Sequence, residues 1–91
     1  MKNGGVTMLK QVIGRRIRDL RITKTDLSQE ELCKKLGLDR TYLSRLESGK
    51  QNITMDNLNL ICNGLKVTLK EFFDIFDEEI IEKIVEEKDY E

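Results

Sequence analysis

Apolar residues recur at three- and four-residue intervals along almost the whole of this 91-residue chain, and no proline interrupts them. This spacing is that of one face of an α-helix, whereas a half-buried strand needs strict alternation, which little of the sequence shows. A chain of this length has room for a single hydrophobic core. The pattern therefore predicts one compact, all-α domain built from short helices.

The first predicted helix covers residues 8–24 and begins after Thr7, a candidate N-cap. Its expected buried stripe consists of Leu9, Ile13, Ile17 and Leu20, and its solvent side carries Arg15, Arg16 and Arg18.

Residues 28–48 carry the clearest start and stop signals. Ser28 and Glu31 form an S-x-x-E capping box, in which two free backbone N–H groups are satisfied reciprocally. Gly37 supplies the positive-φ residue that closes this second helix, and Asp39 can cap a third, which runs to about residue 48.

Three further helices are predicted toward the C-terminus. The fourth covers residues 54–65, and a second capping box, Thr68 with Glu71, starts a fifth that continues to residue 76. Residues 77–88 read as an acidic amphipathic helix.

The second and third helices have the features of a helix-turn-helix. Cys33 is a small side chain at the point where the two helices approach, and Gly37 lies where the chain must turn. The alternative is an ordinary αα-hairpin within a helical bundle. The apolar residues that must face the core are Leu32, Leu36, Leu38, Leu43 and Leu46.

The third helix has an outer face suited to reading DNA. With its leucines inward, Arg40, Thr41, Ser44 and Arg45 lie together on the opposite side. Arginine can donate two hydrogen bonds to guanine, and the threonine methyl can pack on a thymine methyl. These four residues are therefore our candidates for contacts with bases in the major groove; the alternative is a solvated polar face.

Five neighbouring residues are candidates for contacts with the DNA backbone. Gln29 opens the second helix, where free N–H groups and the helix dipole favour a phosphate. Lys50, Gln51 and Asn52 follow the third helix, where they either reach the flanking phosphates or form a plain polar loop. Tyr42 either donates its hydroxyl to a phosphate or covers the edge of the core.

The net charge of −1 hides a strong asymmetry. Residues 1–70 contain 14 Lys and Arg against 7 Asp and Glu, whereas residues 71–91 contain 2 basic and 10 acidic residues. The chain is thus a basic body with an acidic C-terminal segment. Because phosphate repels carboxylates, we expect that segment to point away from DNA.

Other classes of function find little support. The chain has no histidine, and Cys33 and Cys62 both lie within helical apolar patterns, which favours buried free thiols over a disulfide or a metal site. No catalytic constellation or phosphate-binding glycine loop is present, so we expect neither an enzyme nor a cofactor. Without a membrane-length apolar run or a signal peptide, the expected location is the cytoplasm and no membrane partner is expected.

The motifs together resemble a known family. The segment LSQEELCKKLGLDRTYLSRLESGKQNITMDNLNLICNGLKVTLKEFF, preceded by IGRRIRDLR, closely resembles the Cro/cI-type (Xre) helix-turn-helix regulators over about residues 13–76. Within that family, DRTYLSRLESGKQNIT is most similar to the controller proteins of bacterial restriction-modification systems.

The resemblance implies a five-helix, lambda-repressor-like DNA-binding domain over residues 1–76. The acidic helix predicted within residues 77–91 goes beyond that minimal domain and is a candidate extension of the dimer interface. The resemblance also implies a homodimer on a roughly palindromic operator, which activates or represses its own gene and the endonuclease gene. RNA polymerase is then a further candidate partner. Arg21 and Glu47 match a pair that family members often bridge, which ties the first helix to the third.

Dimerisation needs a shared apolar surface, for which the last two helices offer candidates that could equally belong to the core. These are Leu69, Phe73, Phe76, Ile80 and Ile84. Competing interpretations of function are a phage-type repressor or antitoxin of the same fold and, from another class, a protein-interaction module that does not read DNA sequence.

Overall fold

The computed structural model describes residues 7–87, which contain six α-helices, one 3-10 helix and no strand. In chain order the elements are α1 (Met8–Lys24), α2 (Gln29–Leu36), α3 (Arg40–Glu47), α4 (Met55–Leu65), α5 (Leu69–Phe72), η1 (Phe73–Ile75) and α6 (Glu78–Glu86). The all-α prediction is confirmed, and α1 has the expected bounds.

Each α-helix begins at a side-chain cap. The capping oxygen accepts a hydrogen bond from the backbone N–H three residues further on, which satisfies one of the free donors of the first turn. The capping residues are Thr7, Ser28, Asp39, Thr54, Thr68 and Asp77. At Ser28 and Thr68 the reciprocal glutamate bond is also present, so both predicted capping boxes are confirmed.

The turns after the helices use left-handed backbone. Gly37 closes α2 with φ of 71°, as predicted, and Gly49 follows α3 with φ of 77°. Lys66 takes the same conformation after α4 (φ 63°), where a side chain makes it less favourable.

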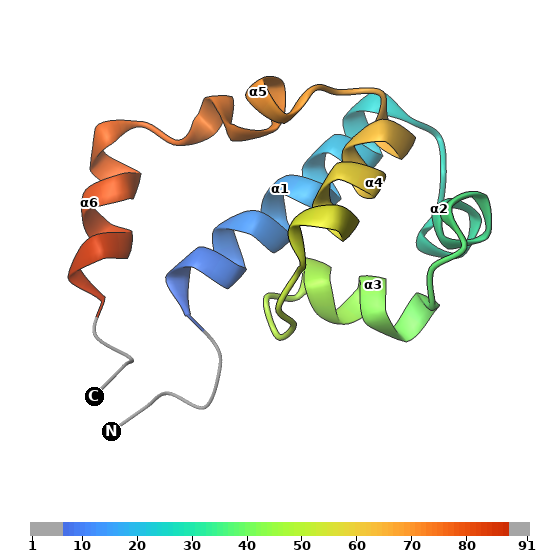
Figure 1. The fold of residues 1–91 in the computed structure, drawn as a ribbon, viewed down its shortest axis with the longest axis horizontal. Coiled ribbons are helices and arrows are strands. Elements are labelled where there is room, and N and C mark those ends of the chain that lie inside the picture. Colours follow the sequence, from blue (N-terminus) through green and yellow to red (C-terminus); the bar gives the residue numbers. More distant parts are fainter. Residues whose placement is uncertain (1–6, 88–91) are drawn as a thin grey trace.

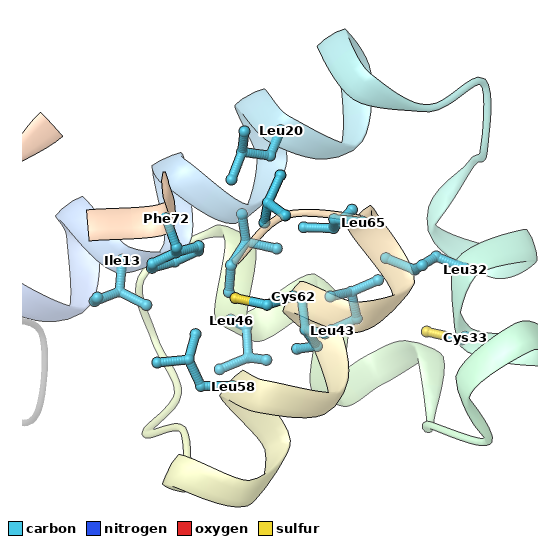
Figure 2. Close-up of a cluster of buried hydrophobic side chains, with 13 residues drawn as sticks. Ile13, Leu20, Leu32, Cys33, Leu43, Leu46, Leu58, Cys62, Leu65 and Phe72 are labelled. Carbon is cyan, nitrogen blue, oxygen red and sulfur yellow. The ribbon is translucent and has the colours of Figure 1, made fainter. Parts of the chain in front are cut away.

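The core lies where α1, α3 and α4 meet, and α2 and α5 close it at two sides (Figure 1). In Figure 2, Phe72, Ile13, Leu46, Leu58 and Cys62 gather around one centre, while Cys33 lies apart on the α2 side. The buried apolar residues are Ile13, Ile17, Leu20, Leu32, Cys33, Leu43, Leu46, Leu58, Ile61, Cys62, Leu65, Val67 and Phe72.

Two expectations for α1 were wrong. Leu9 is 43% exposed, because it belongs to the first two turns of the helix, before the close packing that begins at Ile13. Arg16 is half-buried rather than in water. Its Nε donates to the carbonyl of Phe72 (2.8 Å) and its Nη2 to that of Glu71 (2.6 Å).

The same arginine accounts for the shape of the following segment, where one helix was expected through residue 76. In a continuous α-helix the carbonyls of Glu71 and Phe72 would accept from the N–H groups of residues 75 and 76. Here Arg16 takes both carbonyls, and α5 ends at Phe72 and tightens into η1. As a result Phe72 is fully buried and Phe73 is 39% exposed.

The last helix, α6, packs beside α1 (Figure 1). It is shorter than predicted, ending at Glu86, and Lys88 lies outside the described residues. Its Ile80 and Ile84 are half-buried, whereas Ile81 and Val85 are exposed. Among residues 7–87, no helix is both long and apolar enough to cross a membrane.

Candidate nucleic-acid interface

The second and third helices cross steeply. Figure 1 shows α2 almost end-on while α3 lies along its length at the edge of the molecule. Leu32, Leu43 and Leu46 are buried between these helices and the rest of the core. The opposite side of α3 is therefore turned outward, as a helix-turn-helix requires.

The four candidate base-reading residues share this outer side. Arg40, Thr41, Ser44 and Arg45 are all exposed and together line one open hollow of about 290 Å³. The side chains of Arg40, Thr41 and Ser44 make no hydrogen bond within the described chain, so their donors and acceptors face solvent. Their roles toward DNA remain predictions.

Arg45 is already engaged with the loop that follows α3. Its Nε donates to Gln51 Oε1 (3.1 Å) and its Nη2 to the Lys50 carbonyl (2.8 Å). A guanidinium has five N–H donors, so three stay available for a base edge. These hydrogen bonds tie the loop to the outer face of α3. In the loop, Gln51 is half-buried, and Lys50 and Asn52 are exposed.

Tyr42 covers the edge of the core, which is one of the two possibilities that its sequence position left open. Its ring is half-buried against the core, and its hydroxyl oxygen accepts a hydrogen bond from Asn57 Nδ2 (2.9 Å). Because the oxygen is the acceptor, the hydroxyl hydrogen remains free to donate outward. Tyr42 thus links α3 to α4, and its contact with a phosphate stays a prediction.

An ion pair ties α1 to the end of α3. Arg21 Nε lies 2.8 Å from Glu47 Oε2, and Nη2 donates to Oε1 (3.0 Å). The hydrogen bond to Glu47, with the charge of the carboxylate, raises the pKa of Arg21 although burial opposes the rise. The side chains are only 12% and 3% exposed, so each charge depends on the other.

Gln29 is hydrogen-bonded to the glutamate of this ion pair. Its Nε2 donates to Glu47 Oε1 (2.9 Å), and Arg21 Nη1 donates to the carbonyl of Leu27 just before α2. The N-terminus of α2, which is the candidate phosphate site, is therefore held against the end of α3.

Gly14 is a residue of the interface that the sequence reasoning missed. A Cβ at this position would overlap the carbonyl oxygen of Leu46, and would lie 3.2 Å from the carbonyl carbon of Glu47. The absence of a side chain lets α1 approach the backbone of α3 closely. An isolated glycine inside an apolar helical pattern was the available signal.

The candidate dimer residues fall into two groups. Leu69 and Phe73 are partly exposed, and the Phe73 ring also packs edge-on against Phe72 and Phe76. Phe76, Ile80 and Ile84 are half-buried within the subunit. Phe73 lies with Leu9 and Ile53 on the wall of a shallow, mostly apolar hollow of about 240 Å³. We call these three residues the apolar patch.

The two cysteines belong to the core. Both are free and buried, as predicted, and burial raises the pKa of each thiol. No group of three or more potential ligands in residues 7–87 is arranged to hold a metal ion.

Comparison with known proteins agrees with this geometry. Residues 17–72 match the helix-turn-helix family model HTH_3. Control protein C.MunI of a Mycoplasma species is 44% identical over 71 residues, which are 78% of this chain and 96% of that protein. Control protein C.BamHI of Bacillus amyloliquefaciens is 35% identical over 66 residues, covering 72% of this chain and 82% of that protein.

Solved structures show the same likeness. The restriction-modification controller protein C.Esp1396I, as a tetramer in complex with its natural 35 base-pair operator, has a TM-score of 0.67 and 35% sequence identity. That match covers 86% of this chain and 96% of the other.

Proposed function

Because this chain belongs to the helix-turn-helix family, we propose that it is a sequence-specific DNA-binding regulator that controls transcription in a restriction-modification system. The observation that carries the proposal is the outward face of α3, where Arg40, Thr41, Ser44 and Arg45 are exposed and together line one open hollow. The other side of this helix packs on α1 and α2. The similar controller proteins support the choice of system.

In this proposal α3 enters the major groove and its exposed side chains contact base edges. The phosphates on one side are bound at the N-terminus of α2 by Gln29. On the other side they are bound by Lys50, Gln51 and Asn52, with a further hydrogen bond from Tyr42. The loop contribution follows from the Arg45 contacts, because base reading and loop position are then coupled.

The functional unit is proposed to be a homodimer, because one eight-residue recognition helix can read only a few base pairs. A two-fold dimer places the same surface of each subunit against itself. The exposed apolar patch and Leu69 provide such a surface, and Ile81 and Val85 on α6 can extend it. Its operator is then roughly palindromic.

The gene targets proposed are its own and that of the partner endonuclease, with RNA polymerase as the partner when the regulator activates. The site of action is the cytoplasm, where the DNA is. The chemistry is binding alone, with no catalytic step.

A titration of the protein against DNA from immediately upstream of its own gene tests the proposal. We expect a complex that survives excess scrambled competitor and weakens steeply as salt rises, because Lys and Arg contacts release counterions. A second, slower complex at higher protein concentration would indicate adjacent dimers. Equal affinity for the upstream and scrambled duplexes would overturn the proposal.

A further inference from the structure

Two arginines of α1 have no role in the fold. Of the four arginines in this helix, Arg16 binds the carbonyls at the end of α5 and Arg21 pairs with Glu47. Arg15 and Arg18 are exposed, and within residues 7–87 neither makes a hydrogen bond or an ion pair. The fold therefore leaves two positive charges available on one helix.

Arg15 and Arg18 lie beside the C-terminal end of the recognition helix. They border an open polar hollow of about 630 Å³, and Ser48 forms part of its wall. Because Ser48 follows Ser44 by four residues, it lies one turn further along the same outer face of α3. Its hydroxyl donates a hydrogen bond to the Arg45 carbonyl (3.1 Å).

One wall of the same hollow is linked to the start of α2 by a hydrogen bond. Glu47, which forms this wall, accepts the hydrogen bond from Gln29, the first residue of that helix. The charge of Glu47 is balanced by Arg21, which leaves Asp19 as the one unbalanced carboxylate against two arginines. The lining of the hollow is thus positive on balance. The hollow adjoins the end of α3 directly, and through Glu47 it is linked to Gln29 at the start of α2.

We propose that Arg15 and Arg18 bind phosphates of the DNA backbone beyond the bases read by α3, on the strand that passes the N-terminus of α2. The inference rests on the proposed function and adds α1 as a further surface for the same partner. Contacts of this kind supply affinity and orientation without sequence preference. Arg15 and Arg18 should therefore lengthen the protected stretch of each half-site without changing the operator sequence.

The test compares Arg15→Gln, Arg18→Gln and the double variant with wild type and with Lys70→Gln. Glutamine keeps helix propensity while removing the charge. Lys70 is an exposed cation on α5, at the opposite side of the molecule from α3 (Figure 1). Affinity for the upstream operator and for a scrambled duplex of equal length is measured by fluorescence anisotropy at several salt concentrations.

The plot of log K against log salt has a negative slope. We expect each arginine substitution to make that slope less steep by about 0.9, and the double variant by about twice that. Affinity for both duplexes should fall by the same factor, because phosphates carry no sequence information. Hydroxyl-radical cleavage should reveal lost protection at the outer flank of each half-site. Lys70→Gln should follow wild type.

A double variant with the slope and footprint of wild type would overturn the inference while leaving the proposed function intact. Unchanged DNA binding with lost activation by RNA polymerase on the same promoter would also overturn it, and would identify the surface as a protein contact. A wild-type protein that binds neither duplex would overturn the proposed function and this inference together.

Discussion

Among single residues, the arginines of this protein differ in whether their side chains bind other groups of the fold. Arg16 and Arg21 are anchored by carbonyl or carboxylate oxygens within the fold, and Arg40 projects from α3 with no partner in the described chain. Arg45 stands between these groups, since it holds the following loop and keeps donors for a base. Function is therefore expected where the fold leaves a guanidinium unused.

Arg40→Ala and Arg45→Ala should each weaken operator binding by roughly 1–3 kcal/mol while leaving the free energy of unfolding nearly unchanged, because both side chains are exposed. Arg45→Ala should also loosen the loop through Gln51. Anisotropy titrations on the operator measure the loss, with Lys34→Ala, an exposed cation near the end of α2, as the control of equal charge. Unchanged affinity in both variants would place the recognition face elsewhere.

Glu47→Ala should lower the free energy of unfolding by roughly 3–5 kcal/mol, because it leaves the Arg21 charge nearly buried without a partner. Replacing both residues by apolar ones, Arg21→Met with Glu47→Leu, should recover much of this loss. Urea unfolding measures both.

The control for that prediction is a solvent-exposed ion pair of the same protein. Lys83 and Glu79 lie 3.5 Å apart on α6. Lys83→Ala should change stability by less than about 1 kcal/mol. Equal losses from Glu47→Ala and Lys83→Ala would show that the Arg21–Glu47 pair is not the tie between α1 and α3 that its burial indicates.

At the scale of the elements, the position of α3 depends on how closely α1 can approach it. Gly14 permits this approach, and the Arg21–Glu47 pair fixes it at the last residue of α3, next to the polar loop. Gly64 of α4 is less tightly constrained than Gly14. An added Cβ there would lie 2.8 Å from the flexible end of the Leu36 side chain of α2, not against backbone.

Gly14→Ala should therefore destabilise the protein by roughly 1–3 kcal/mol, even though alanine favours helix by up to about 1 kcal/mol, because a backbone carbonyl cannot move aside. Gly64→Ala gains the same propensity but can be accommodated by a side-chain rotation, so its stability should stay much closer to wild type. Thermal unfolding of the two variants provides the comparison. A Gly14→Ala protein as stable as Gly64→Ala would contradict the close crossing of α1 and α3.

At the scale of the whole molecule, the described chain presents two exposed surfaces of different character. The outer face of α3 is polar and basic, whereas the apolar patch at Leu9, Ile53 and Phe73 is suited to self-association. Acidic α6 lies beside α1, toward the end of the molecule away from α2 (Figure 1). The acidic helix is thus remote from α2, although Arg15 of α1 borders a hollow that it shares with Ile80 of α6.

Phe73→Asp should weaken the homodimer by at least about 10-fold. Complete burial of a phenylalanine contributes roughly 1.5–3 kcal/mol, and although part of the Phe73 ring is already covered in the subunit, a two-fold dimer contains the residue twice. The subunit should still fold, because Phe73 is exposed in it. Sedimentation equilibrium measures the dimer constant, and operator affinity should fall with it. A dimer constant equal to that of wild type would remove the apolar patch from the interface.

Val85→Asp tests separately whether α6 extends the dimer. Val85 is 73% exposed, so the substitution should not disturb the packing of α6 on α1. We expect a smaller weakening than for Phe73→Asp, because valine buries less area. No weakening at all would confine the interface to the apolar patch and α5.

The features that follow from the sequence alone are local. Helix starts at Ser28 and Thr68, the turn at Gly37 and the shared outer face of Arg40 and Arg45 follow from capping chemistry and helical spacing, which act over a few residues. Tertiary structure alone decided the contacts between distant segments. Arg16 binds the carbonyls at which the predicted fifth helix ends early, and Gly14 lies against the backbone of α3. Arg15 and Arg18 have no hydrogen bond or ion pair within residues 7–87. These outcomes depend on which atoms meet across 30 to 60 residues of chain, and periodicity along one helix carries no information about that meeting.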